Sequence, residues 1–399
     1  MNKSIFPYEE EKLKADKAIN NGRPYQQCKI SVMDTIADPD ITFDENGISN
    51  YYYEFQNKLA VHVLTGVDGE RKLQEITNKI KSESKGQKYD CITGVSGGVD
   101  STYVCYLAKK LGLNPLIVHF DNGWNSQTAN QNIQNIISKL GFDLYTLVVE
   151  WDEFKDLQLS YLKASVVDIE AITDHAIITT MYKLAKKHNI KYILSGNNIV
   201  TEATLPKSWI WNKGDHVNIL DIHKKYGTLP LKTFPLFNTM LKKYYKAKGI
   251  ENITPLNYID YNKGKVKEII TGELGWQDYG GKHYESIWTR FYQGYILPTK
   301  FGIDKRKAHL SDLIFSKQIS KETALDELKL PIYEEQQFRQ DYDFVLKKLN
   351  LSEQEFDQIM KLPVRKHQDF KTEKSIWAQY PILEPVRPLW RVVKKALKV

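Results

Sequence analysis

The sequence predicts an α/β protein with a doubly wound, mostly parallel sheet. Between residues 89 and 196, short apolar runs alternate with stretches of helical spacing. Strands that are apolar along their whole length are typical of parallel sheets covered by helices on both faces. A glycine-rich turn follows the first run, and such sheets bind ligands beyond the carboxyl ends of their strands. We therefore expect the functional site at that edge of the sheet.

The expected elements follow one another in a regular order. The expected strands are YDCITGV (89–95), PLIVHFD (115–121), LYTLVVE (144–150) and KYILSG (191–196). The expected helices between them are STYVCYLAKKLG (101–112), QTANQNIQNIISKLG (127–141) and the stretch 174–188. The first two of these helices end at a glycine, a common C-terminal cap. A charged helix at 71–87 leads into the first strand.

The length of the chain predicts two or three domains. Residues 1–70 are a polar, turn-rich N-terminal region, and residues 71–300 contain the α/β pattern. Helical spacing dominates residues 301–399. We expect the basic, amphipathic tail (388–399) to pack on its own domain, although a membrane-surface or partner-docking role is the alternative.

Composition favours a soluble protein with an anionic ligand. Hydrophobic residues make up 42% of the chain, which is ample for packed cores and does not suggest disorder. The net charge of +7 is spread along the sequence. A charge of this kind fits ATP or a nucleotide sugar about as well as RNA, and a solvated mixed surface is the plain alternative.

The cysteine content indicates a reducing compartment. The three cysteines, Cys28, Cys91 and Cys105, are too few for a disulfide framework. The N-terminus lacks an apolar signal segment, and no run of about 18 apolar residues occurs. We expect a cytoplasmic protein that does not span a membrane.

The strongest signal for chemistry lies in the turn after the first strand. This turn is Ser96-Gly97-Gly98-Val99-Asp100-Ser101. The two glycines allow the backbone to approach a phosphate closely, with N–H groups and a helix N-terminus facing the anion. The two serines add hydroxyl donors, and Asp100 is suited to bind Mg²⁺. The spacing is not that of a Walker A loop, and the structural alternative is a glycine turn with Asp100 as a helix cap.

This SGGVDS motif resembles the loop of the PP-loop ATP pyrophosphatases, the superfamily of asparagine, GMP and NAD synthetases and several tRNA-modifying enzymes. The resemblance implies an adenine nucleotide α-hydrolase-like fold that binds ATP with Mg²⁺ and releases AMP and pyrophosphate. It also implies adenosine contacts at Phe120 and Asp121, a glycine turn at Gly196, and Glu202 as a second magnesium ligand. Asp121 is otherwise an ordinary turn residue, and Glu202 an acid at a helix start.

Other stretches are similar to the N-acetyl sugar amidotransferases over essentially the whole chain. These stretches are FDNGW (120–124), EAITDHAI (170–177), GWQDYGGKHYES (275–286) and LPTKFGIDKRKAHLSDLI (297–314). The resemblance implies a bacterial enzyme of surface-polysaccharide, O-antigen or flagellin glycan synthesis that converts an acetamido group on a sugar into an acetamidino group. It implies a cytoplasmic carbon–nitrogen ligase with no nucleic-acid partner.

Several charged residues in these stretches are candidates for the site. The cations are Lys300, Lys305, Arg306, Lys307 and His309, of which we expect Lys300 and Arg306 to act in catalysis by stabilising a departing pyrophosphate or a substrate diphosphate. The candidates for substrate binding are Glu170, Asp174, His175, Lys282, His283 and Glu285. A solvated basic helix start, or acids at a helix N-terminus, would explain these charges without function.

The N-terminal region departs from the same family. The family carries two Cys-x-x-Cys zinc pairs around a segment like MDTIADPDITFDENG (33–47), and the four matching positions here are Cys28, Ser31, Ser49 and Tyr52. Serine and tyrosine do not hold structural zinc at neutral pH, so we expect that zinc is lost and the fold survives less stably. Whether the cysteines were lost naturally or altered stays open.

The resemblance implies a mechanism and a partner. The acetamido oxygen attacks the α-phosphorus of ATP, and ammonia then displaces AMP. None of the three cysteines has the setting of a glutaminase nucleophile, so ammonia is expected from separate glutaminase and synthase-barrel subunits. A tRNA-modifying enzyme and a degenerate nucleotide-binding scaffold are the alternatives.

Overall fold

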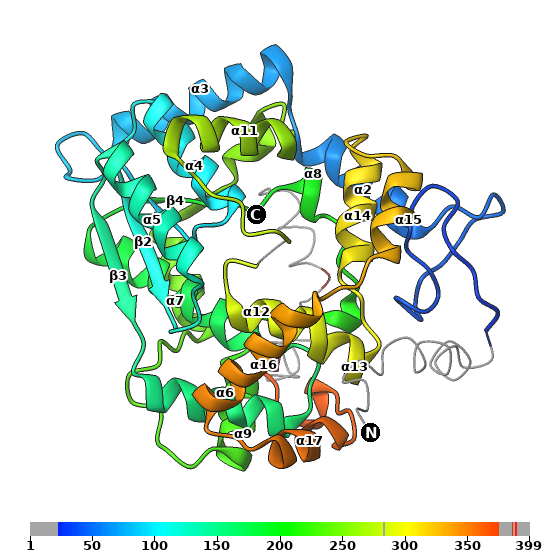
Figure 1. Cartoon of the computed structure of the whole chain (residues 1–399). Helices are drawn as coiled ribbons and strands as arrows, with labels where there is room; N and C mark the ends of the chain where they lie inside the picture. Colours follow the sequence, from blue (N-terminus) through cyan, green and yellow to red (C-terminus); the bar gives the residue numbers. More distant parts are fainter. Residues whose placement is uncertain (1–22, 282–283, 375–384, 386–387, 389–399) are drawn as a thin grey trace.

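Five parallel strands form one sheet in the computed structural model, which describes residues 23–281, 284–374, 385 and 388. The strands are β1 (Cys91–Gly94), β2 (Pro115–Asp121), β3 (Leu144–Val148), β4 (Tyr192–Leu194) and β5 (Glu251–Ile253). Their order across the sheet is β3-β2-β1-β4-β5, and Figure 1 shows β3 beside β2 at one edge. The chain winds from β1 through β2 to β3 and then continues on the other side of β1, which confirms the predicted doubly wound class. The strand order reverses between β1 and β4.

Helices connect the strands and fill the rest of the structure. In the first half of the chain they are α2 (Asn50–His62), α3 (Gly66–Glu83), α4 (Val99–Lys110), α5 (Gln127–Leu140), α6 (Trp151–Ala164), α7 (Ala171–Lys187) and α8 (Ile199–Glu202). Then come α9 (His216–Tyr226), α10 (Thr239–Ala247), α11 (Lys263–Leu274), α12 (Ile287–Phe291), α13 (Leu297–Phe301), α14 (Arg306–Phe315), α15 (Lys321–Lys329), α16 (Glu335–Leu349) and α17 (Glu353–Lys361). Short 3₁₀ helices are η1 (Lys207–Trp209), η2 (Pro255–Tyr258) and η4 (His367–Asp369), and η3 (Tyr292–Ile296) is a π-helix.

The two faces of the sheet pack into two different cores. Neighbouring residues in a strand point to opposite faces, so Cys91 and Ile92 of β1 belong to different clusters. Helices α3, α4, α5 and α11 cover the face of Cys91, and α7 and α10 cover the face of Ile92. Burial of both faces explains why the strands are apolar along their length.

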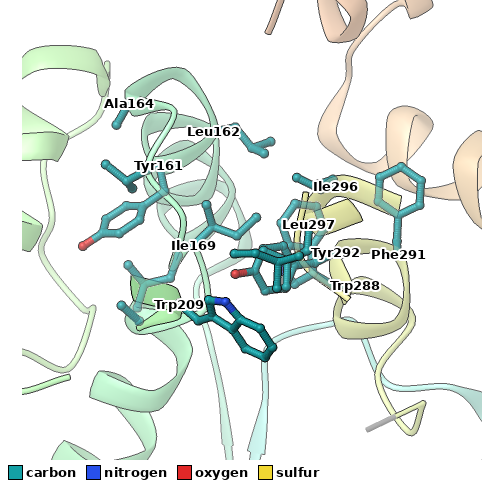
Figure 2. Close-up of a cluster of buried hydrophobic side chains, with 14 of the residues drawn as sticks. Tyr161, Leu162, Ala164, Ile169, Trp209, Trp288, Phe291, Tyr292, Ile296 and Leu297 are labelled. Carbon is teal, nitrogen blue, oxygen red and sulfur yellow. The ribbon is translucent and has the colours of Figure 1, made fainter. Parts of the chain in front are cut away.

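The C-terminal helices share a third core with the α/β part of the chain. Aromatic residues of α12 and η3, including Trp288 and Tyr292, pack towards α6 and towards Trp209 (Figure 2). Figure 2 shows Ile169 between Tyr161 of α6 and this group. The helical region predicted at the C-terminal end is confirmed, and its helices start at Ile287.

The N-terminal region docks on α14 and α15. Lys307 of α14 pairs with the buried Asp34 at 2.5 Å, and Lys321 of α15 donates to the carbonyl of Cys28 at 2.7 Å. Trp209 donates its indole N–H to the carbonyl of Ala37 at 2.8 Å. These contacts fix the region to elements that line the site described below.

Three details differ from the sequence prediction or add to it. The fifth strand, β5, was not expected, since it has three residues in a polar stretch. The edge strand β3 is more exposed than a buried parallel strand, with Val148 66% exposed. Within residues 23–281 and 284–374, no helix is long and apolar enough to cross a membrane.

Candidate active site

The SGGVDS turn lies at the point where the strand order reverses. It joins β1 to α4, and β1 lies between β2 and β4 in the sheet. Gly97 has φ +80°, and a Cβ on it would lie 2.7 Å from the carbonyl oxygen of Ala129. Only glycine fits there without strain. A Cβ on Gly196, after β4, would lie 3.1 Å from the backbone N of Ser101, so the two turns are in close contact.

Side chains hold the turn in shape. The hydroxyl of Ser101 accepts from the backbone N–H of Ser96 at 3.3 Å, and the hydroxyl of Ser96 accepts from the N–H of Gly98 at 3.2 Å. The indole of Trp276 donates to the carbonyl of Gly97 at 2.9 Å. These contacts fix the backbone of the turn at the start of α4, where N–H groups can face an anion.

A cavity of about 220 Å³ opens over this turn, and we call it the loop cavity. The predicted residues that line it are Ser96, Gly98, Val99, Asp100, Ser101, Gly196, Glu202 and Glu285. Most of the ATP-binding candidates predicted from the sequence, and both magnesium candidates, therefore lie around one cavity in the structure. Gly97 itself shapes the turn beneath them.

Asp100 and Glu202 bring two carboxylates to the wall of the loop cavity. The phenol of Tyr261 donates to Asp100, and the amide of Asn198 lies 3.5 Å from the same oxygen. Burial raises the pKa of Tyr261, and the negative charges of Asp100 and Glu202 raise it further. No group of three or more His, Cys, Asp or Glu side chains is placed to hold a metal within the described residues. Mg²⁺ bound with a nucleotide uses one or two carboxylates plus phosphate oxygens, so this pair fits it.

Two lysines that the sequence did not single out also line the loop cavity. Lys263 and Lys267 lie one turn apart on α11. The ammonium of Lys267 pairs with Asp278 at 2.7 Å, and that of Lys263 lies 3.3 Å from the imidazole Nε2 of His309. Their spacing of four residues after a helix N-cap at Asn262 was the signal available in the sequence.

A second cavity of about 620 Å³, which we call the large cavity, adjoins the first. Both cavities are lined by Asn197, Glu202 and Gly281. The walls come from the segments after β4 and β5, from the start of α14 and from the segment after α15. Its apolar side includes the indole of Trp209 and the side chain of Leu205.

The structure corrects the catalytic assignment of Lys300. Its ammonium donates to the carbonyls of Ile359, Met360 and Leu362, at 2.7, 3.1 and 3.0 Å, and so caps the end of α17. Burial lowers the pKa of Lys300 to about 8. Lys300 lines neither cavity, because α13 points it towards the C-terminal helices.

Arg306 lines the large cavity but also has a structural role. Its guanidinium pairs with Asp304 at 2.9 Å and donates to the carbonyls of Glu327 and Leu330 at the end of α15. The residue therefore ties the start of α14 to α15 and borders the cavity at the same time.

The structure also corrects the substrate-binding assignment of His175. The side chain is 1% exposed, its Nδ1 lies 2.7 Å from the carbonyl of Lys213, and its Nε2 accepts from the N–H of Phe237 at 3.0 Å. Asp174 pairs with Lys213 at 3.1 Å. Both residues stabilise the packing around α7 and line neither cavity.

Glu170 does not line the large cavity itself but contacts a residue that does. It accepts from the hydroxyl of Thr289 at 2.5 Å and from the amide of Gln293 at 3.3 Å, and Gln293 lines that cavity. Lys282 and His283 lie outside the residues that the structure describes.

Glu285 faces the loop cavity and not the large one. Its carbonyl accepts from the N–H of Ser126 at 2.8 Å, next to an antiparallel bridge between Asn125 and Ser286. Its carboxylate accepts from the hydroxyl of Ser96 at 3.3 Å. A residue predicted to bind substrate hydroxyls is therefore in contact with the phosphate turn.

Phe120 and Asp121 line neither cavity. Phe120 packs edge-on against Phe154, with ring centroids 6.5 Å apart. Asp121 accepts from the N–H of Gly123 at 2.8 Å, as in a turn. Their adenosine contacts stay a prediction.

Three of the four positions matching the family's zinc site lie together. Cys28, Ser31 and Ser49 are fully buried, and the sulfur of Cys28 accepts from the N–H of Ser49 at 3.3 Å. Burial raises the pKa of the Cys28 thiol, but hydrogen bonds from Ser49 and Ser31 outweigh it, so the net pKa is lowered. The ring of Tyr52 packs against Phe315, with centroids 5.6 Å apart. One thiol and two hydroxyls are not a zinc donor set.

Comparisons with known proteins match two separate parts of the chain. Residues 90–206 match the family described as queuosine biosynthesis protein QueC, and residues 285–384 match the C-terminal domain described as LPS biosynthesis protein WbpG-like. A tRNA(Ile)-lysidine synthase from Chlamydia pneumoniae is 37% identical over 71 residues, which are 17% of this chain and 22% of that protein. The chain therefore spans about a fifth of the length of that curated relative.

Solved structures with a similar arrangement include two synthetases. The NH3-dependent NAD synthetase from Campylobacter jejuni is 15% identical, with a TM-score of 0.29 over 52% of this chain and 85% of that one. The NMN synthetase from Francisella tularensis is 15% identical, with a TM-score of 0.28 over 57% and 93%.

The two matched parts meet at the site. The QueC match contains β1 to β4, the SGGVDS turn and Glu202, whereas the WbpG-like match starts at Glu285, whose carboxylate contacts the turn. The chain thus combines a part similar to the QueC family, which carries the SGGVDS turn, with a C-terminal part similar to the WbpG-like domain.

Proposed function

We propose that this protein is an ATP-dependent carbon–nitrogen ligase acting on an N-acetylated sugar, most simply a nucleotide-linked one. It adenylates the acetamido oxygen and lets ammonia displace AMP to give an acetamidino sugar. The observation that carries the proposal is the shared border of the two cavities at Asn197, Glu202 and Gly281. A phosphate chain in the loop cavity and an acceptor in the large cavity would meet there.

The loop cavity supplies positioning and charge for the first step. The acetamido oxygen attacks the α-phosphorus, the bond to the β-phosphate oxygen breaks, and pyrophosphate leaves. Mg²⁺ held by Asp100 and Glu202 would neutralise charge on the phosphates. The turn's N–H groups, Lys263 and Lys267 bind the departing pyrophosphate. The chemistry requires no side-chain nucleophile, since the substrate oxygen fills that role.

The second step needs ammonia at the same border. Ammonia adds to the carbon of the adenylated imidate, a proton leaves the added nitrogen, and the carbon–oxygen bond to AMP breaks. The products are the amidine and AMP. The large cavity holds the sugar, and the apolar side formed by Trp209 and Leu205 suits sugar or nucleoside faces.

We also propose that the ammonia comes from separate glutaminase and synthase-barrel subunits. Cys91 and Cys105 are fully buried, and burial raises the pKa of both thiols, that of Cys105 to about 12. Cys28 is fully buried at the former zinc position. A glutaminase thiolate must be accessible and activated, and these thiols are not.

The ammonia proposal has a direct test. The purified chain should use ammonium at high concentration and should not use glutamine until a glutaminase partner is added. Efficient glutamine-dependent amidination by this polypeptide alone would refute the partner proposal.

A tRNA-modifying activity is the second candidate, favoured by the names of two relatives, queuosine biosynthesis protein QueC and tRNA(Ile)-lysidine synthase. Exchange of labelled pyrophosphate into ATP separates the candidates. We expect exchange when an acetamido sugar nucleotide and Mg²⁺ are present, and not with tRNA. Exchange that depends on tRNA would select the second candidate, and no exchange with either would indicate a nucleotide-binding scaffold.

A further inference from the structure

Helix α14 belongs to the WbpG-like part of the chain but touches the groups that surround the loop cavity. Its first residues, including Arg306 and His309, line the large cavity. Helix α14 also contacts α8 and the first residues of α11. Those two elements carry Glu202 and Lys263, which line the loop cavity.

His309 makes the contact with Lys263. The imidazole Nε2 accepts from the ammonium of Lys263 at 3.3 Å, and Nδ1 lies 3.5 Å from the carbonyl of Thr201, one residue before Glu202. A single side chain of the large cavity thus contacts both α8 and the start of α11, which carry Glu202 and Lys263.

The segment after α14 holds the same lysine by its backbone. The amide oxygen of Gln318 accepts from the N–H of Lys263 at 2.9 Å, and the amide nitrogen of Gln318 lies 3.5 Å from the carbonyl of Tyr261. The phenol of Tyr261 in turn donates to Asp100. Asp312 of α14 accepts from the N–H of Thr204 at 3.0 Å, just beyond Glu202.

We propose that α14 couples the two cavities, with His309 as the residue that positions Lys263 for ATP cleavage. This inference rests on the proposed function and describes how that activity would be regulated. An acceptor in the large cavity contacts α14. Helix α14 in turn positions the ammonium of Lys263 next to the departing pyrophosphate. Small displacements of a charge-stabilising group cost large factors in rate, so the contact can make ATP cleavage depend on the acceptor.

The test compares AMP release with and without an acetamido sugar nucleotide in wild type and in two variants. His309→Leu removes the hydrogen-bond acceptor, and we expect acceptor-stimulated AMP release to fall roughly 10- to 100-fold with the acceptor KM within about threefold of wild type. His309→Gln keeps an acceptor for Lys263 and should restore most of the rate. His62→Gln, at an exposed position of α2, is the matched control.

A double-mutant cycle decides whether His309 acts through Lys263. In a Lys263→Met background the change His309→Leu should have almost no further effect, because the positioned group is gone. Independent, multiplying effects would overturn the proposal, as would a His309→Leu variant that changes only the acceptor KM.

The affinity for Mg-ATP separates this proposal from the proposed function. If wild type releases no AMP with any acetamido sugar, the proposed function fails. The coupling is then tested by measuring the dissociation constant of Mg-ATP for the same four proteins of the cycle. Losses of Mg-ATP affinity that are not additive support the coupling, and additive losses contradict it.

Discussion

The loop cavity and the large cavity share a border but are built in different ways. Five of the six consecutive residues 96–101 line the loop cavity, and the turn after β4 closes one side. The large cavity has no such motif, since its walls come from segments between residues 197 and 332 that only tertiary packing brings together. Under the proposed function, nucleotide binding would thus be local in the sequence, whereas acceptor recognition would depend on how the WbpG-like helices dock.

The largest effect expected from this comparison is at Asp100. Asp100→Asn keeps an oxygen that can accept from Tyr261 but removes a magnesium-binding charge. We expect AMP release to fall by about 1,000-fold or more, with thermal stability close to wild type. Asp152→Asn, in an exposed surface ion pair, is the control. A variant that keeps most of its activity at ordinary Mg²⁺ would remove Asp100 from the metal site.

The second prediction compares Lys267, a lysine of the loop cavity, with Lys300, the lysine that the sequence suggested as catalytic. Lys267→Met should lower kcat roughly 10- to 100-fold, because it removes a cation from the pyrophosphate site. Lys300→Met should leave kcat and both KM values unchanged and lower the unfolding free energy by about 1–2 kcal/mol, since it uncaps α17. Steady-state kinetics and denaturant unfolding measure the two effects, and a kinetic defect in Lys300→Met would restore its catalytic role.

A smaller effect should be confined to the large cavity. Leu205 is 43% exposed and lines that cavity, so Leu205→Ser removes apolar contact area without opening the core. We expect the acceptor KM to rise about 3- to 10-fold, with the ATP KM unchanged. An equal rise in both KM values would show that the cavities are not separate subsites.

The smallest effect concerns the N-terminal region behind the large cavity. Restoring cysteine at Ser31, Ser49 and Tyr52 beside Cys28 should create a four-thiolate site, bind zinc and raise the melting temperature. The ATP KM should not change, because the described part of the region (residues 23–70) contacts Trp209 and α14, and none of its residues lines the loop cavity. Zinc content near zero, compared with the same variant carrying Cys28→Ser, would contradict the alignment of these four positions.

The sequence predicted what depends on local pattern. The apolar strands and the SGGVDS turn could be read because each feature lies within a few residues, whereas Glu202 was identified through the resemblance to the PP-loop enzymes. The role of His175 could not be read, since a histidine at a helix start looks the same whether it faces a cavity or, as here, the carbonyl of Lys213. Lys300 was misplaced for the same reason.

The residues that sequence reasoning missed depend on distant partners. Lys263 faces the loop cavity only because α11 follows the short strand β5, which pairs with β4. Its contact with His309 joins residues 46 positions apart, of which only His309 lies in a part of the chain matched by a family model. No periodicity or motif in one segment reports such a pairing.

The central claim is that the acetamido oxygen of a sugar in the large cavity attacks the α-phosphorus of ATP in the loop cavity. Oxygen-18 placed in the acetamido group of the acceptor tests it directly. The account predicts that the label appears in AMP, which becomes about two mass units heavier, in amounts equal to the amidine formed. Unlabelled AMP with label released to water, or ADP in place of AMP, would contradict it.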